Sequence, residues 1–190
     1  MGMPPEVIDA HPAAAPDLDA WLADPTVRTH HRRTVAATPE ALWRAAQEIR
    51  LADTRALGPL VRWRIPGTPA DQTYAGLFRS YPFTVLEQDE HHVVSGLCGR
   101  IWTLERDYPR LSEPAEFAAW DQPGTVRVLF AHWVAVAGGG GAELYSEARV
   151  KPVDRTAGLR LRALWAVIGR FEPLVASEPL SQAARRAARP

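Results

Sequence analysis

The chain has 190 residues, 46% of them hydrophobic, and its 22 basic and 22 acidic residues leave no net charge. This size and composition are typical of one globular domain that buries most of its apolar surface. The charge balance argues against binding of nucleic acid, because displacing counterions from a duplex needs a basic stripe. Cys98 is the only cysteine, which excludes an internal disulfide.

The sequence carries no signal for secretion or for a membrane span. Residues 1–25 lack a positively charged start and an unbroken apolar stretch, which argues against a secretory signal. No apolar run approaches the length that a bilayer span requires. We therefore expect a cytoplasmic protein without a membrane span.

The first 26 residues carry five prolines among alanines and acidic residues. Each proline removes a backbone donor and disfavours helix in the preceding residue. We expect residues 1–26 to form an extended or partly disordered arm, in which residues 17–23 could form one helical turn. The main domain is then expected over residues 27–190.

The first strand is expected over residues 27–36 and is followed by a clear helix start. Thr38 suits the N-cap, Pro39 the first helical position and Glu40 the first turn. The apolar residues of the helix then recur at three- and four-residue steps, which predicts one buried stripe. A second short helix is expected around residues 51–57, and residues 61–81 have no clear pattern.

A meander of antiparallel strands is expected in the second half of the chain. Residues 83–88 and 93–102 read as paired strands, residues 103–115 as a loop and residues 116–120 as a short strand. A long hairpin then turns at four consecutive glycines. Its two strands are expected over residues 125–136 and 142–150.

The chain is expected to end in helices. Leu161, Leu164, Ile168 and Phe171 fall on one face of a helix that begins after Asp154. Pro173 should end or kink this helix, and a final basic helix is expected at about residues 177–189. Helices segregated from an antiparallel meander predict the α+β class.

Several segments, in this order and spacing, resemble the Bet v 1-like or START-like (SRPBCC) superfamily. They are similar to an uncharacterised bacterial branch related to polyketide cyclase/dehydrase-like proteins, and the resemblance covers about residues 27–188. The residues that carry it are His31, Thr38-Pro39-Glu40-Ala41-Leu42-Trp43, Val94-Ser95-Gly96-Leu97-Cys98-Gly99-Arg100-Ile101-Trp102, Leu144-Tyr145-Ser146-Glu147-Ala148-Arg149-Val150 and Leu164-Trp165.

The resemblance implies a helix-grip fold, in which a curved sheet of six or seven strands wraps a C-terminal helix. Two short helices would follow the first strand. The superfamily holds both binders and enzymes, with a hydrophobic cavity between sheet and helix, which we call the chamber. Two residues depart from the pattern of the branch: His132 replaces an aromatic or aliphatic residue, and Pro173 interrupts the helix.

Glu147 and Arg149 form a candidate polar site. They are two residues apart on a strand, so their side chains share one face. On the chamber side the pair could orient a polar group of a ligand, since neither charge can be buried without a partner at low cost. On a solvated face it would be an ordinary salt bridge. The resemblance favours the chamber.

The register of the hairpin decides which residues join this pair. A symmetric four-glycine loop would place His132 opposite Glu147, which gives a couple suited to acid–base work. A slip of one residue would place Trp133 there instead, with Arg127 on the same face. We favour the second register, because it leaves three valines together on the other face.

Further candidates are weaker. Trp102 follows a strand with two glycines and could line the chamber mouth, and Arg64 matches an arginine of the branch pattern. Neither a zinc motif nor a phosphate-binding loop is present, so we expect no metal and no cofactor.

Three functions remain open. We favour a binding protein for a small apolar or amphipathic molecule, with Glu147, Arg149, Trp102, Trp133, Arg127 and Arg64 as ligand-binding residues. The first alternative is a cyclase or dehydratase in which Glu147 acts with Arg149 or His132. The second is an interaction module without a ligand. The sequence fixes neither the ligand nor the oligomeric state.

Overall fold

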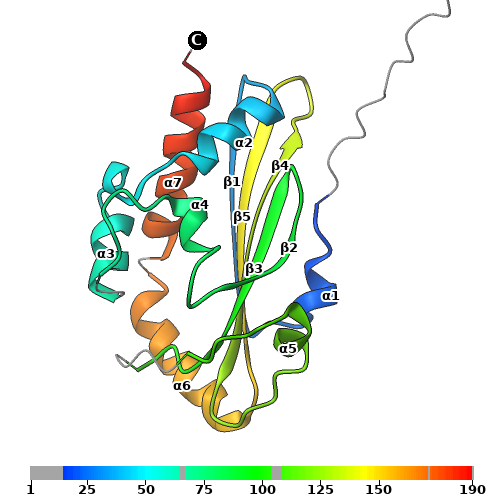
Figure 1. Cartoon of the computed structure of the whole chain (residues 1–190), viewed down its shortest axis with the longest axis vertical. Coiled ribbons are helices and arrows are strands. Elements are labelled where there is room, and N and C mark those ends of the chain that lie inside the picture. The colour runs from blue at the N-terminus through cyan, green and yellow to red at the C-terminus, as the bar shows by residue number, and fades with distance from the viewer. Residues whose placement is uncertain (1–14, 65–66, 104–107, 171, 190) are drawn as a thin grey trace, which may run out of the picture.

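The computed structural model describes residues 15–64, 67–103, 108–170 and 172–189. Its centre is one curved antiparallel sheet of five strands in the order β1-β5-β4-β3-β2 (Figure 1). The α+β class is therefore confirmed, with five strands in place of the expected six or seven. The strands are β1 (Val27–Val35), β2 (Thr84–Gln88), β3 (His92–Gly99), β4 (Val126–Val136) and β5 (Ala142–Pro152).

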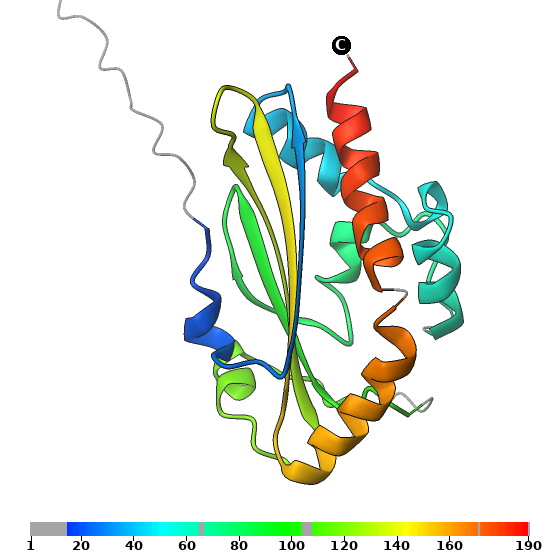
Figure 2. The ribbon, with the colours of Figure 1, turned by 180° about the vertical axis from the view of Figure 1, so that it is seen from behind.

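Helices cover both faces of the sheet, and the two layers differ in size (Figures 1 and 2). We call the face beneath the larger layer the front face and the opposite one the back face. The back face carries α1 (Leu18–Leu22) and α5 (Pro114–Ala118). The front-face helices are α2 (Pro39–Gln47), α3 (Leu57–Arg64), α4 (Tyr74–Leu77), α6 (Arg155–Ile168) and α7 (Glu172–Ala187).

The two layers explain why the central strands are apolar on both sides. Every residue of β3 is buried, and β4 alternates only weakly between buried and half-buried positions. A strand covered on both faces loses the period of two that marks a half-solvated strand. The edge strand β1 keeps this period, because its even-numbered side chains from Arg28 to Thr34 point to solvent.

The first front-face helix begins as the sequence predicts. The Thr38 hydroxyl accepts a hydrogen bond from the Ala41 N–H at 3.2 Å, and Pro39 occupies the first turn. Leu42 is fully buried and packs in one cluster with Leu144 and Leu180, from β5 and α7. This cluster ties α2 and α7 to one end of the front face.

The C-terminal segment forms two helices, as expected, but their bounds differ from the prediction. The Asp154 carboxylate caps α6 by accepting from the Ala157 N–H at 2.8 Å, and α6 ends at Ile168. Pro173 is the second residue of α7, so it starts a helix, because a first-turn N–H needs no helical partner. α7 consequently begins five residues before the expected basic helix.

Two further expectations were wrong. Residues 116–120 form no strand: Pro114 starts α5, and the Glu116 carboxylate accepts from the Ser112 N–H at 2.9 Å. The expected second helix around residues 51–57 is a 3₁₀ turn over Leu51–Asp53, followed by α3. Gly58 and Pro59 lie within the first turn of α3, where proline is tolerated.

The hairpin adopts neither register considered from the sequence. Val136 pairs with Ala142, so Ala131 lies opposite Glu147, and Trp133 lies opposite Tyr145. The reason is a longer loop, because Ala137 leaves the strand and its N–H donates to the Gly141 carbonyl at 3.0 Å. Three consecutive glycines, residues 139–141, adopt positive φ angles that side chains rarely allow.

The expected N-terminal arm contains a packed helix. The single turn expected over residues 17–23 is confirmed as α1, and Leu18 and Leu22 are buried against the back face with Phe117 and Leu129. Residues 1–14 lie outside the described residues, so the extended or disordered arm stays a prediction. None of the helices in the described ranges has the length and apolarity needed to cross a bilayer.

Candidate functional site

A row of polar side chains crosses the middle of the front face. His31 on β1 pairs with Ser146 on β5, and Ser146 pairs with His132 on β4. Cross-strand partners point to the same face, so these three side chains lie side by side beneath the helices. Apolar clusters flank the row along the strands, one around Leu42 and Leu144 and the other around Val128 and Leu161. We call these three residues, with their helical partners Tyr74 and Glu172, the polar belt.

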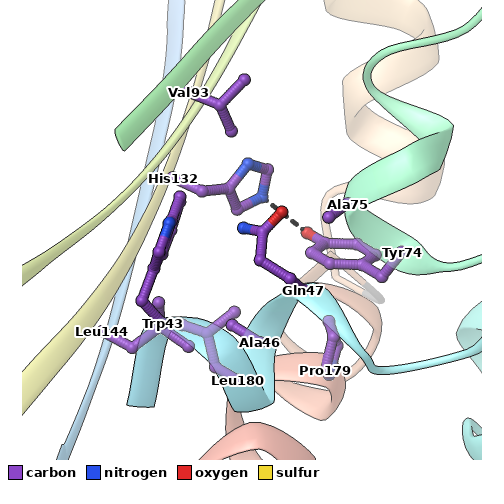
Figure 3. A pocket seen from close by; sticks show the side chains of 10 residues that line it. All are labelled: Trp43, Ala46, Gln47, Tyr74, Ala75, Val93, His132, Leu144, Pro179 and Leu180. Carbon is purple, nitrogen blue, oxygen red and sulfur yellow. Dashed lines mark hydrogen bonds between the residues drawn. The ribbon is translucent and has the colours of Figure 1, made fainter. Parts of the chain in front are cut away.

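The centre of the polar belt is a histidine–tyrosine pair. His132 is 7% exposed, and its Nε2 lies 2.8 Å from the Tyr74 hydroxyl, as the close-up shows (Figure 3). Burial, aided by the charge of Arg79, lowers the pKa of His132 to about 3. Burial likewise raises the pKa of Tyr74, partly offset by a hydrogen bond with Ser146. Both groups are thus neutral at physiological pH.

The edge of the polar belt holds an acid–histidine pair. Nε2 of His31 lies 2.9 Å and 3.2 Å from the two carboxylate oxygens of Glu172, in the first turn of α7. The two side chains are 16% and 20% exposed. The pair therefore lies near the surface, at the start of α7, which packs along β1 (Figure 2).

A small cavity adjoins His132. Its volume is about 20 Å³, which is enough for roughly one water molecule. Tyr74 and Gln47 face it beside His132, while α2, α4, β5 and α7 supply the apolar wall (Figure 3). The remaining lining residues are Trp43, Ala46, Ala75, Val93, Leu144, Pro179 and Leu180.

Two buried polar groups near the front face have no hydrogen-bond partner in the part of the chain that the structure describes. Ser95 is fully buried on β3, where it pairs with Phe130, and its hydroxyl bonds to nothing. Trp102 packs against the apolar cluster around Val128 and Leu161, and its indole N–H is likewise unpaired. Such groups are rare in folded proteins, because each unmade bond costs about 1–3 kcal/mol.

A larger hollow of about 530 Å³ lies on the outer surface, between the start of α3 and α7. Arg55, Glu178, Gln182 and Arg185 line it. The Glu178 carboxylate is already occupied, since it accepts from the N–H groups of Ala56 and Leu57 at 3.0 and 3.1 Å. This hollow is an open, polar groove in which the carboxylate serves to start α3.

The structure places Glu147 and Arg149 on the back face, away from the chamber in which they were expected. The reason is strand alternation: Ser146 and Ala148 point to the front helices, so residues 147 and 149 point to α1. Their side chains are 2% and 6% exposed, and Arg149 Nε donates to Glu147 at 2.6 Å. Whether either residue touches a ligand stays a prediction.

The back-face pair belongs to a closed ionic network. Arg28 donates two hydrogen bonds to the Glu147 carboxylate, at 2.9 and 3.0 Å. Burial alone would raise the pKa of Glu147, but the bonds from Arg28 and Arg149 outweigh it and hold this pKa below its ordinary value. Arg149 also donates to Asp19 and to the Leu22 carbonyl, which fixes α1 to the sheet.

The other predicted site residues are divided between the two faces of the sheet. Trp133 lies on the back face with its ring stacked on Tyr145, 4.9 Å between centroids. Arg127 shares that face and donates to the Ala118 carbonyl of α5 at 3.0 Å. Trp102 alone among these lies at the front-face cluster, beneath the Arg160 guanidinium. The side chain of Arg64 lies outside the described residues.

The described residues include no cluster of histidine, cysteine and carboxylate groups that could hold a metal ion. Cys98 is buried on the back face, and burial raises the pKa of its thiol to about 12. This thiol is therefore protonated and unreactive at neutral pH.

Sequence reasoning missed Tyr74, Ser146 and Glu172 as site residues. Tyr74 lies in the segment 61–81 that had no clear pattern, and Glu172 lies in the expected break between helices. His132 was weighed only as an acid–base partner of Glu147, in the register that was not favoured. Two features could have pointed to His132. It stands where the branch pattern has an aromatic or aliphatic residue, and strand alternation places it on the same face of the sheet as Ser146.

No protein-family model and no curated protein matches the chain. Solved structures with distant similarity include a Chromobacterium violaceum protein (14% identity, 86% of this chain and 99% of that chain, TM-score 0.39). A Thermus thermophilus protein shares 12% identity over 85% and 97% of the two chains, with a TM-score of 0.32. An aromatase/cyclase from a Streptomyces species shares 16% identity over 84% and 94%, with a TM-score of 0.34.

At these TM-scores the similarities say nothing about ligand or activity. The class of protein follows from the chain's own architecture, which is an α+β domain with a curved antiparallel sheet closed by C-terminal helices. This arrangement is consistent with a helix-grip fold.

Proposed function

We propose that the protein binds a small amphipathic molecule between the front face of the sheet and the helices α2, α4, α6 and α7. The apolar part of the ligand would contact the aromatic side chains around Phe78 and Phe130, whose rings lie 5.0 Å apart. Its polar part would meet the polar belt at His132 and Tyr74. Sites of this kind combine an apolar lining with a few placed polar groups.

The observation that carries the proposal is the burial of neutral polar groups among apolar side chains between the sheet and its helices. Burying an imidazole and a phenol costs desolvation free energy that an aliphatic pair would not incur. Ser95 and Trp102 support the proposal further, since their unpaired groups can bond to an oxygen of a ligand. An indole N–H only donates, so its partner would have to be an acceptor.

Binding would require the chamber to widen, because the present cavity holds about one water molecule. Two walls are suited to move. α4 is a single turn of four residues, and α7 carries Pro179 inside its helix at the cavity wall. A proline inside a helix removes one backbone hydrogen bond and so weakens the helix at that point.

The catalytic alternative finds less support in this geometry. Glu147 and His132 lie on opposite faces of the sheet, so they cannot act on one substrate. The pKa of Glu147 is lowered and that of His132 is about 3, while a general acid or base works best near the pH of the reaction. Binding therefore accounts for the polar belt better than acid–base catalysis does.

Equilibrium binding of an amphipathic dye, anilinonaphthalene sulfonate, tests the proposal. We expect saturable binding by the folded protein and a roughly tenfold loss of affinity in His132→Leu, the typical effect of removing a buried hydrogen-bonding partner. Trp133→Phe is the matched control, because residue 133 neighbours His132 on β4 and points to the back face. Equal affinity for both variants, or no saturable binding by folded protein, would overturn the proposal.

A further inference from the structure

The outer surface of α6 is unusually apolar for an exposed helix. Only Ala157, Gly158 and Leu161 are buried beneath it. Leu159 is 57% and Val167 63% exposed, and residues 159, 163 and 167 follow one another at four-residue steps on the outward side. Such spacing places them in one stripe along the helix.

Arginines flank this apolar stripe. Arg155, Arg160 and Arg162 are all exposed, and α6 contains no acidic residue. At 100° per residue, Arg160 and Arg162 fall on opposite sides of the stripe, and Arg155 lies at its beginning. The helix therefore presents apolar side chains between positive charges.

The neighbouring helix α3 has the same character. Trp63 is 67% and Leu60 45% exposed, Arg62 is exposed as well, and this helix too lacks acidic residues. α3 starts beside Glu178, whose carboxylate holds its first N–H groups, and both helices lie on the front-face side of the sheet (Figures 1 and 2).

Exposed large hydrophobic side chains are concentrated on these two helices and are rare on the rest of the described surface. Among the described residues, seven large hydrophobic side chains are exposed, and five of them lie on α3 and α6. The chain as a whole is electrically neutral. These two helices therefore carry most of the exposed large hydrophobic side chains of a neutral protein, with exposed arginines on the same helices. We call Leu60, Arg62, Trp63, Arg155, Leu159, Arg160, Arg162 and Val167 together the basic apolar surface.

We propose that the basic apolar surface binds peripherally to the headgroup region of an anionic lipid membrane. Helices with arginines beside Trp, Leu or Ile side chains lie in that interface, with the apolar side chains in the acyl boundary and the charges among the headgroups. Two helices of 8 and 14 residues give a contact of limited depth.

Charge complementarity selects this partner over the two others that such a surface could meet. A second copy of the chain, related by a two-fold axis, would place the same arginines against one another. Nucleic acid would match the charges, but its phosphates offer nothing to the exposed Leu159 and Val167. An anionic bilayer satisfies both the arginines and the aliphatic side chains.

Sedimentation with lipid vesicles tests the proposal with the whole chain. We expect binding to vesicles that contain phosphatidylglycerol, weak binding to phosphatidylcholine alone, and weakening by salt. Arg162→Glu and Trp63→Ala should each lower the partition coefficient, the former by at least about fivefold, because one basic residue near such a surface contributes about 1 kcal/mol. Both side chains are exposed, so neither variant should affect folding.

Val136→Ala is the matched control, since Val136 is an exposed apolar residue at the far end of the hairpin, 55% accessible. Binding that this control lowers as much as Trp63→Ala would overturn the proposal. So would equal binding to neutral vesicles, equally tight binding to duplex DNA, or a dimer that Trp63→Ala dissociates. The test is independent of the chamber ligand, because dye binding and vesicle binding are separate readouts.

Discussion

The two faces of the central sheet bury polar groups in opposite ways. On the back face, Glu147 and Arg149 are fully charged and every charge has a partner, with Arg28 and Asp19 completing the network. On the front face, His132 and Tyr74 are neutral and pair with each other beside a small cavity. A closed ionic network needs no ligand. A neutral pair beside a cavity leaves room for a ligand that bonds to it.

This contrast reverses the expectation that charge marks the site. A charged pair within an apolar strand predicts a buried polar function, yet the structure uses it to attach α1 to the sheet. Buried ion pairs are stable only when all their partners are present, which makes them good structural links and poor ligand sites. The candidate site instead centres on the neutral pair of His132 and Tyr74.

The largest expected effect concerns the back face. Glu147→Gln leaves Arg149 buried without a counter-charge, and it should lower the free energy of unfolding by about 4 kcal/mol in urea denaturation. Arg32→Gln is the control, because Arg32 is 60% exposed where it meets Glu143, and we expect a change below about 1 kcal/mol. A similar small loss for both variants would show that the network is not structural.

A somewhat smaller effect is expected from α1. Leu22 is 1% exposed in the back-face core, so Leu22→Ala should lower the free energy of unfolding by about 3 kcal/mol. The same substitution at Leu159, which is exposed on α6, should change it by less than about 0.5 kcal/mol. If Leu22→Ala were equally mild, α1 would not be part of the folded core.

The third prediction concerns His132 on the front face, which should make the free energy of unfolding depend on pH. The folded pKa of His132, about 3, lies below the ordinary value of 6.5, so only the unfolded chain gains this proton in between. Stability should therefore fall as pH drops from about 6.5, by up to about 1.4 kcal/mol per pH unit. His132→Phe should reduce the change in the free energy of unfolding between pH 6.5 and 5, as measured by urea denaturation. His30→Gln, at an exposed position, should leave this change as it is in the wild type.

Much of the fold was predictable because it depends on local signals. Thr38 and Pro39 start α2, Asp154 starts α6, and the four glycines turn the hairpin. The failures had two causes. The register shift is local, because Ala137 leaves its strand and bonds to Gly141. The replacement of a strand by α5 depends partly on distant contacts, since α5 packs on β2 and β3.

The candidate site was harder to predict for the same reason. Strand alternation correctly placed Trp133 and Arg127 on the face of Glu147, and His132 on the other. Which of these faces meets the C-terminal helices is decided by the path of the chain after Pro152. Tyr74 lies 58 residues from its partner His132, and Glu172 lies 141 residues from its partner His31, so no local pattern marks either residue.

The most direct test of the central claim is native mass spectrometry of freshly purified protein. We predict a non-covalently bound small molecule that organic solvent releases, present in the wild type and in Trp133→Phe and depleted in His132→Leu. Bare polypeptide mass in folded wild-type protein, together with no saturable dye binding, would contradict a ligand site on the front face. Retention of the molecule by His132→Leu and its loss from Trp133→Phe would place that site on the back face instead.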